Sequence, residues 1–543
     1  MIETENELRD KILKSQRFGI ALPLTSLLTR DSFETGDFYT LEKMAPFMKE
    51  IGATILQLLP LNDVGFGRSP YSSISAFAID PLYISLHNLG LDIKNRKAVI
   101  QTVEINIRRV RELKVKALLE YFQKNLNTEL EIELKEFRKS QIWLDSYIAF
   151  KILYEKNQGE SFLTWKESEY SKEVEKQILA AHEIESKFIC FLQFTAYAQL
   201  RKVKNIFETA NIFLKGDMPI LTAKNSADVW AKKNLFLLDL QAGAPPDQFS
   251  DIGQNWAFPI FNWEEMKKEN YAWWKDRLKY LENFFHIYRI DHVLGMYRIW
   301  AIPEKAESAK QGYFFPQIGT SRAEFLEVNL KPEDFVNRKI IYEFEKDKFI
   351  FYWDFYKYEG YYTLDEEIKK RLYPLSHKHL KEDEKFWKKA GEEILSLFLN
   401  SSNMLPCAED LGAVPAFVRD SIIENKVIGL DIIRWTRSLD DGTFIKAKDY
   451  RKNAVSSFSV HDTSLALEWW EDFPDEEKKV FAELIGHDLT DTSKFNLMKQ
   501  FIEFALSTNS LFSIQLFNDI LFEERANSIN CFMRLNLLVS VRS

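Results

Sequence analysis

The sequence predicts an α/β protein built on a closed (β/α)8 barrel, or TIM barrel, with helical subdomains inserted between its strands. Short apolar segments indicate buried strands, amphipathic helical segments between them are typical of parallel βα units, and about eight such units close a barrel. The predicted strands are Phe18–Leu22, Thr54–Leu59, Ile212–Leu214, the segment that ends just before Arg289, Met404–Ala408, Ile428–Ile433, Val455–Val460 and Leu511–Leu516.

Residues 1–543 are expected to form this single barrel, since barrels often exceed the length of an average domain. Two intervals interrupt the alternation of strands and helices. The first, about 95–190, is rich in Lys, Glu, Leu and Ile, and the second, about 310–400, is charged and aromatic; both are interpreted as mostly helical insertions. In the first, a helical face is predicted from apolar residues at steps of three and four: Ile107, Val110, Leu113, Ala117 and Tyr121. A coiled-coil partner site is an alternative that this short, irregular repeat does not require.

Composition and charge exclude several classes of protein. Hydrophobic residues make up 46% and charged residues 28% of the chain, which is typical of a globular protein and excludes wholesale disorder. The 81 acidic residues outnumber the 72 Lys and Arg residues, and the net charge is -9. This balance argues against nucleic acid or an anionic membrane as the main partner.

Cysteine usage and the N-terminus favour a cytoplasmic protein. Cys190, Cys407 and Cys531 are odd in number and far apart, so the sequence has neither a disulfide framework nor a zinc-site spacing. Reduced cysteines fit the cytoplasm. The first residues have no pattern of a signal peptide, and the chain has no run of about 18 apolar residues that could span a membrane.

One motif points to chemistry: Arg289-Ile290-Asp291-His292, at the end of an apolar strand. In a strand, Arg289 and Asp291 point toward the same face. A guanidinium beside a carboxylate lowers the pKa of the acid and keeps it ionised, as a nucleophilic carboxylate requires. For these four residues alone, an ordinary Arg–Asp surface pair is the competing interpretation.

Further acids follow other predicted strands, and a barrel brings the C-terminal ends of its strands together at one rim. A cluster of carboxylates there suits glycosidic chemistry, in which one ionised acid attacks the anomeric carbon and one protonated acid assists the leaving group. A single acid after a strand is more often a helix N-cap, as Asp410 or Asp431 could be. The four candidates are Asp217, Asp291, Glu409 and Asp462.

Several motifs together resemble the amylomaltases, which are 4-α-glucanotransferases of the α-amylase clan. Residues 254–266 further resemble the plant cytosolic, maltose-acting type of disproportionating enzyme, without its starch-binding modules. The chain departs from the family after Ile529-Asn530, where Cys531 and Phe532 follow in place of Pro-Gly and a tryptophan. The matching motifs are Ser69–Ser73, Ser75–Ala78, Gly216–Ile220, Ser226–Trp230, Gly243–Asp247, Gly253–Trp256, Arg289–His292, Ala408–Gly412 and His461-Asp462.

The resemblance implies a role for each matching residue. Asp291 is expected to be the nucleophile, Glu409 the general acid/base, and Asp462 a third acid that holds ring hydroxyls. Substrate binding is expected of Arg289, His461, Asp217, Tyr71, Trp256 and His292, with Tyr71 and Trp256 stacked on sugar rings. A tryptophan of the core or of a lid is the alternative for Trp256. No metal or organic cofactor is expected.

The predicted function is therefore 4-α-glucanotransfer with retention: a glucosyl or maltooligosyl segment passes to the 4-hydroxyl of glucose, a maltooligosaccharide or a glycogen-like glucan. A retaining hydrolase of the same clan differs only in its acceptor and is the nearest alternative. A glucan-binding protein with a silent barrel is the other, and the intact acids argue against it. Expected partners are maltose, maltooligosaccharides and glycogen or a similar α-glucan.

Overall fold

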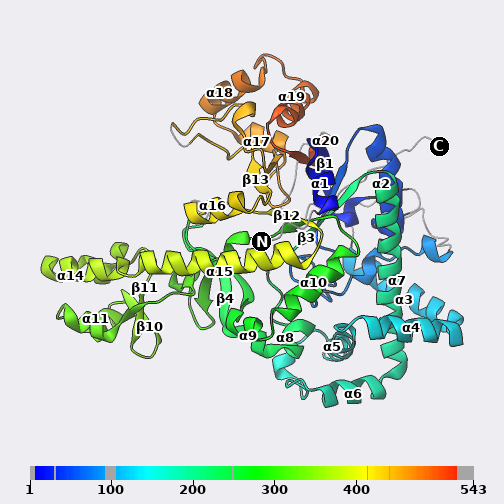
Figure 1. Cartoon of the computed structure of the whole chain (residues 1–543), viewed down its shortest axis with the longest axis horizontal. Helices are drawn as coiled ribbons and strands as arrows, with labels where there is room; N and C mark the ends of the chain where they lie inside the picture. The colour runs from blue at the N-terminus through cyan, green and yellow to red at the C-terminus, as the bar shows by residue number, and fades with distance from the viewer. Residues whose placement is uncertain are drawn as a thin grey trace.

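A barrel of eight parallel strands lies at the centre of the molecule (Figure 1). The structure is a computed structural model that describes residues 6–29, 32–91, 106–247, 250–412, 414–438 and 441–521. The strands are β1 (Arg17–Leu22), β2 (Ile55–Leu58), β3 (Phe213–Met218), β6 (Ile287–Ile290), β12 (Leu405–Ala408), β13 (Gly429–Ile432), β14 (Ala454–Ser457) and β15 (Phe512–Leu516).

The barrel is almost fully closed, and its strands follow one another in chain order around it. The sheet runs β12-β6-β3-β2-β1-β15-β14-β13. Its two ends meet at a parallel bridge between Cys407 and Ile428, where the Ala408 N–H donates to the Ile428 carbonyl at 2.7 Å. The predicted barrel is thereby confirmed, and each predicted strand overlaps one of its strands.

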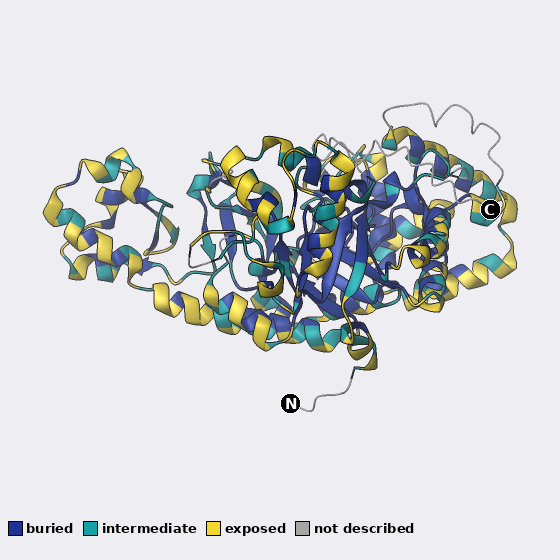
Figure 2. Ribbon diagram, turned by 90° about the horizontal axis from the view of Figure 1, so that it is seen from above, coloured by how far each residue is buried: buried dark blue, intermediate teal, exposed yellow. Residues whose placement is uncertain are grey.

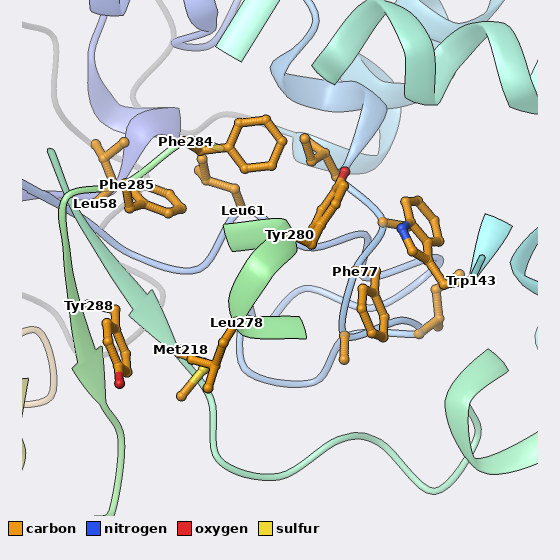
Figure 3. Packing of buried hydrophobic residues seen from close by; sticks show 14 of the residues in the cluster. Leu58, Leu61, Phe77, Trp143, Met218, Leu278, Tyr280, Phe284, Phe285 and Tyr288 are labelled. Carbon is orange, nitrogen blue, oxygen red and sulfur yellow. The ribbon is translucent and has the colours of Figure 1, made fainter. Parts of the chain in front are cut away.

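Side chains alternate between the inside and the outside of the barrel. Phe213 and Ile287 pack inside it, and Ile12 of the preceding helix α1 (Glu7–Leu13) belongs to the same interior cluster. Tyr288 and Ile290 pack outside, in the large cluster shared with the surrounding helices (Figure 3). The alternation places Arg289, between Tyr288 and Ile290, on the interior face. Figure 2 shows buried residues concentrated in and around the barrel.

Helices surround the strands, as in other βα barrels. Within the described ranges, no helix is long and apolar enough to cross a membrane. Those that precede or follow barrel strands are α2 (Phe38–Glu50), α7 (Glu183–Thr209), α10 (Ala272–Glu282), α15 (Leu380–Ser401), α16 (Ala416–Glu424), α17 (Ala466–Asp472), α18 (Asp475–Ile485), α19 (Lys494–Ser507) and α20 (Phe517–Ile520).

A group of helices lies between β2 and β3: α3 (Ile107–Asn125), α4 (Thr128–Ser140), α5 (Leu144–Lys156) and α6 (Lys172–Ala181), followed by α7. The predicted face of α3 is correct at Val110, which is buried, and Ala117 and Tyr121 pack against the core. It is wrong at Leu113, which is exposed, while the neighbouring Lys114 is buried. Lys114 is buried because its ammonium donates to the carbonyls of Leu82 and Ile84 and pairs with Asp37. A charged residue thus takes a core position that the apolar pattern did not indicate.

The sequence did not predict an antiparallel sheet beside the barrel, formed by β5 (Gln254–Phe261), β4 (Phe236–Ala244), β7 (Ile299–Pro303) and β8 (Tyr313–Phe315). Two short helices, α8 (Ala227–Ala231) and α9 (Trp263–Lys268), lie close in sequence to β4 and β5. This sheet positions the segment that carries Trp256.

Residues 320–377 form a separate lobe, here called the outer lobe, at the far end of α15 (Figures 1 and 2). Its own hydrophobic cluster includes Phe325, Phe335 and Leu372. The lobe contains strands as well as the helices expected there: β9 (Thr320–Ser321), α11 (Arg322–Glu327), α12 (Pro332–Val336), β10 (Ile341–Glu345), β11 (Lys348–Phe351), α13 (Glu359–Tyr362) and α14 (Glu366–His377).

Candidate active site

Three neighbouring strands bring the predicted site residues together at the C-terminal rim of the barrel. In the register of β3 and β6, Asp217 lies beside Arg289, and in the register of β6 and β12, Cys407 lies beside Arg289. Asp291 directly follows β6, and Glu409 directly follows β12. Residues far apart in the sequence therefore converge because their strands are adjacent.

The Arg289 guanidinium contacts three carboxylates. Its Nη1 donates to Oδ1 of Asp217 and to Oδ1 of Asp291, both at 2.8 Å, and its Nη2 lies 3.8 Å from Oε2 of Glu409. The Arg289 side chain is only 9% exposed. Burial lowers the pKa of Arg289, but the charges of Asp217 and Asp291 outweigh burial and raise that pKa above its ordinary value. A permanent positive charge therefore sits at the centre of the acids.

Glu409 is suited to hold a proton. Burial raises its pKa to about 8, and the nearby charge of Asp291 adds to the shift while Arg289 opposes it. Its Oε2 accepts the backbone N–H of His292 at 2.7 Å, which fixes the carboxyl group beside Asp291. A carboxylic acid that is protonated near pH 7 can serve as a general acid.

The pKa of Asp291 is shifted upward, whereas the sequence predicted that Arg289 would lower it. Arg289 does lower the pKa of Asp291, but burial and the charge of Asp217 raise it further, so the net shift is upward. The hydrogen bond from Arg289 still favours the ionised form of Asp291. The two acids thus face one guanidinium in unequal environments, which is the arrangement that separates a nucleophile from a proton donor.

Tyr71 links the Asp217 carboxylate to the two adjacent residues His461 and Asp462. Its hydroxyl lies 2.6 Å from Oδ2 of Asp217 and 2.6 Å from Nε2 of His461, whose Nε2 is also 3.0 Å from Oδ2 of Asp462. The Tyr71 hydroxyl donates its single hydrogen to Asp217, so Nε2–H of His461 is the donor on the other side. The tyrosine and imidazole rings are stacked, 5.2 Å apart.

Asp462 is the most exposed of the site acids, with 58% of its side chain open to solvent. Burial acts to raise its pKa, but the hydrogen bond and charge of His461 outweigh this and lower the pKa. Asp462 is therefore ionised at neutral pH and accessible from solvent.

Trp256 and His292 contact each other next to Glu409. Their rings meet edge to face with centroids 4.9 Å apart. Burial and the nearby charge of Arg289 lower the pKa of His292 to about 4, so the imidazole is neutral. Trp256 is half-buried on β5, so it is not a fully buried core tryptophan.

A small cavity of about 30 Å³ continues into the barrel below the rim, between Arg289, His461, Lys215 and Gln57 among others. This volume holds one or two water molecules and is too small for a larger ligand. Lys215 donates to Oε1 of Gln57 at 2.7 Å and is an interior cation that the sequence analysis missed. The period of two could have indicated it, because Lys215 precedes Asp217 by two residues in the same strand.

Asp410 and Asp431 do not cap helices, although a helix cap was the alternative interpretation for them. Both pair with Arg451, at 2.6 Å and 2.7 Å, and the Leu430 N–H donates to Asp410. Helix α16, which follows Asp410, has Pro415 at its N-cap. These two acids connect barrel strands near Glu409.

The fold and the acids at its rim define a class, a barrel enzyme equipped for chemistry at a glycosidic bond. Residues 22–531 match the model of a family described as 4-alpha-glucanotransferase, and the chain belongs to this family. The 4-alpha-glucanotransferases of Chlamydia pneumoniae and Chlamydia caviae are each 31% identical, over 93% of this chain and 86% and 84% of theirs. The rice 4-alpha-glucanotransferase DPE2 is 28% identical over 87% of this chain and 60% of its own length.

Solved structures agree with the fold. An amylomaltase from Streptococcus agalactiae, in complex with acarbose, superimposes with a TM-score of 0.72 at 21% identity, over 95% of this chain and 93% of that one. The amylomaltase from Corynebacterium glutamicum gives 0.68 at 18% identity, over 94% and 68%. The resemblance predicted from the motifs is confirmed, and 4-alpha-glucanotransfer on α-glucans is favoured over the hydrolase and silent-barrel alternatives.

Proposed function

We propose that this enzyme disproportionates α-1,4-glucans by a retaining double displacement with Asp291 as nucleophile and Glu409 as acid and base. The observation that carries the proposal is the pair of carboxyl groups on either side of one guanidinium, with the pKa of Glu409 raised to about 8. Arg289 donates directly to Asp291 and lies farther from Glu409, so its charge favours the ionised form of Asp291 more than that of Glu409.

In the first step, Asp291 attacks the anomeric carbon of a donor glucan while Glu409 gives its proton to the leaving 4-oxygen. A β-linked glycosyl-enzyme forms, and the shortened glucan departs. In the second step, Glu409 takes the proton from the 4-hydroxyl of an acceptor, which attacks the same carbon and releases Asp291. Two inversions leave the α configuration unchanged.

The remaining residues are assigned to substrate binding. Asp462 and His461 receive ring hydroxyls of the sugar at the cleaved bond, and Asp217 with Tyr71 keeps this set in place through the Tyr71 hydroxyl. Trp256 offers an aromatic face beside His292, over which a glucan ring can stack. Stacking buries the C–H face of the sugar.

The proposed donors and acceptors are maltose, maltooligosaccharides and glycogen-like glucans, and the proposed compartment is the cytoplasm. The free, buried thiols of Cys190 and Cys407 support a reducing compartment. Nucleic acid and membranes are not proposed as partners, given the net charge of -9.

Bond counting tests the function. The pure enzyme is incubated with maltotriose, with and without glycogen, and reducing ends are measured together with product lengths. Transfer gives glucose and longer maltooligosaccharides at a nearly constant number of reducing ends. A rise in reducing ends that matches the loss of substrate would identify a hydrolase instead, and Asp291→Asn is the inactive control.

A further inference from the structure

The outer lobe carries three tyrosines around one buried ring, here called the tyrosine face: Tyr356, Tyr361 and Tyr373. Tyr356 and Tyr373 are 43% and 45% exposed. The rings of Tyr356, Tyr361 and Tyr373 surround the buried ring of Phe355, with centroids at 5.8, 5.2 and 6.3 Å from it. The hydrophobic cluster of the lobe places Phe355 in its interior and leaves these rings partly outside.

Polar groups border these rings. Asp354 accepts hydrogen bonds at 2.7 Å from both the Tyr356 hydroxyl and the Lys357 ammonium. Lys369 lies 5.7 Å from the centre of the Tyr361 ring, and the His377 ring is 4.7 Å from the ring of Tyr373. Because the rings of Tyr356, Tyr361 and Tyr373 all contact the ring of Phe355, they lie close to one another on the lobe.

The chemistry of this surface fits a neutral sugar chain. A glucosyl ring has a face of C–H bonds and an edge of hydroxyls, which match an aromatic ring bordered by charged and hydroxyl groups. Positive and negative charges are mixed here, since Asp354 and Glu359 lie among Lys357 and Lys369, so the surface does not select a polyanion. Charged side chains between the rings are also uncommon in the core of a protein–protein interface.

We propose that the tyrosine face is a second glucan-binding site, which holds one chain of a large α-glucan while the barrel rim acts on another. The choice of ligand rests on the proposed function; the binding surface itself is separate from the site acids. Helix α15 connects the outer lobe to β12 and Glu409, and its 22 residues extend over about 33 Å. A branched polymer has many chain ends, so one of them can lie on the outer lobe while another enters the barrel rim.

A glucan held on the lobe raises the local concentration of its other chain ends at the rim. The site thus assists transfer to and from polymers and leaves transfer between short oligosaccharides unchanged. A substitution in the tyrosine face should therefore affect only transfer on polymers, whereas a substitution within the barrel site should affect transfer on short oligosaccharides as well.

Glycogen binding is measured by native gel electrophoresis in gels that contain glycogen, with saturating maltotriose to occupy the barrel site. The parent is Asp291→Asn, which prevents turnover. The double variant Tyr356→Ala/Tyr373→Ala in this background is expected to bind glycogen at least fivefold more weakly. The matched control is Phe386→Ala, since Phe386 is 52% exposed on α15, outside the tyrosine face.

Activity is measured in parallel with Asp291 intact. The double variant should keep the parental rate on maltotriose and lose at least half of the rate enhancement that glycogen provides as acceptor. Equal glycogen binding by the double variant and its parent would overturn the inference. If sedimentation then showed that the parent is a dimer and the double variant a monomer, the tyrosine face would be a contact between two copies of the chain instead. The two proposals can also fail separately. If the double variant binds glycogen more weakly but the enzyme with Asp291 intact shows no transfer on maltotriose, the second site is upheld and the proposed function is rejected.

Discussion

The backbone N–H of His292 donates a 2.7 Å hydrogen bond to Oε2 of Glu409. Since His292 directly follows Asp291, one peptide group fixes the spacing between the two proposed catalytic carboxyls. His292 adopts a left-handed conformation with φ of 46°, which costs a non-glycine residue about 1–3 kcal/mol and is maintained where the surrounding structure requires it. Retention requires a separation of roughly 5–5.5 Å between the carboxyl groups.

Glu409→Gln should lower the rate on maltotriose by roughly 10²- to 10⁴-fold, because proton donation to the leaving sugar is lost. A maltosyl fluoride has a good leaving group and needs little protonation. The variant should therefore still form the glycosyl-enzyme from the fluoride and accumulate it, since deglycosylation lacks a base. Intact-protein mass spectrometry detects the adduct. Asp291→Asn is the control, and an adduct on that variant would mean that the roles are misassigned.

The activity on maltotriose should fall as the pH rises through about 8, because Glu409 must be protonated for the first step and burial raises its pKa to about 8. A pH profile of kcat/KM measures this alkaline limb. With the fluoride donor, which needs no proton, the limb should disappear from the formation of the glycosyl-enzyme. An identical limb for both donors would assign the titration to another group.

The raised pKa of Glu409 also predicts how the stability of the folded enzyme depends on pH. The pKa of Glu409 is about 8 in the folded enzyme and near 4.5 when unfolded, so the folded state binds this proton more tightly. Its stabilising contribution is complete below about pH 4.5 and is lost as the pH rises through about 8. Between these values, the free energy of unfolding of Glu409→Gln should depend less on pH than that of the wild type, as urea titrations at several pH values would measure.

Tyr71→Phe should reduce kcat/KM about 10- to 100-fold, since it removes the hydroxyl between Asp217 and His461 and leaves buried polar groups with one partner fewer, a cost of about 1–3 kcal/mol. The ring and its stacking on His461 remain. Tyr39→Phe is a matched control, because Tyr39 also stacks on a histidine, His87, away from the site acids. Similar losses in both variants would assign the effect to stability.

Asp63→Asn should lower the free energy of unfolding by about 3–5 kcal/mol, because it leaves the buried Lys151 ammonium without its closest carboxylate. Asp63 accepts from Lys151 and Tyr147 of α5, at 2.9 and 2.7 Å, and its backbone bonds to Ile74 and Ala78 close the loop that carries Tyr71. The control is Asp145→Asn, whose partially exposed pair with Arg138 should contribute less than about 1 kcal/mol. Equal losses in a urea titration would contradict this role.

The barrel could be predicted because each of its strands is a short apolar segment next to a helix. The sheet of β4, β5, β7 and β8 could not, since β4 and β5 are partly exposed and pair with irregular register, which removes both the apolar run and the regular alternation. The altered C-terminus after Asn530 lies outside the described residues, as do residues 92–105 at the start of the first predicted insertion.

Within the site, the positions of the acids followed from the strand ends, but their protonation did not. The pKa of Asp291 depends on how deeply the rim is buried, which a pattern of residue types cannot measure. The hydrogen bonds of Tyr71 also escaped the sequence, because they join three segments that only the closed barrel brings together.

The pairing of β1 with β15 has a consequence for how the chain is made. Arg17 pairs with Phe512, so the first barrel strand meets its second neighbour only after β15 has been synthesised and has left the ribosome. At the roughly 5–20 residues per second of protein synthesis, about 25 to 100 s separate the two strands. Throughout that time β1 presents an open edge, and an open edge invites pairing with other chains. Successful production of this enzyme therefore depends on protection of its nascent N-terminal strand.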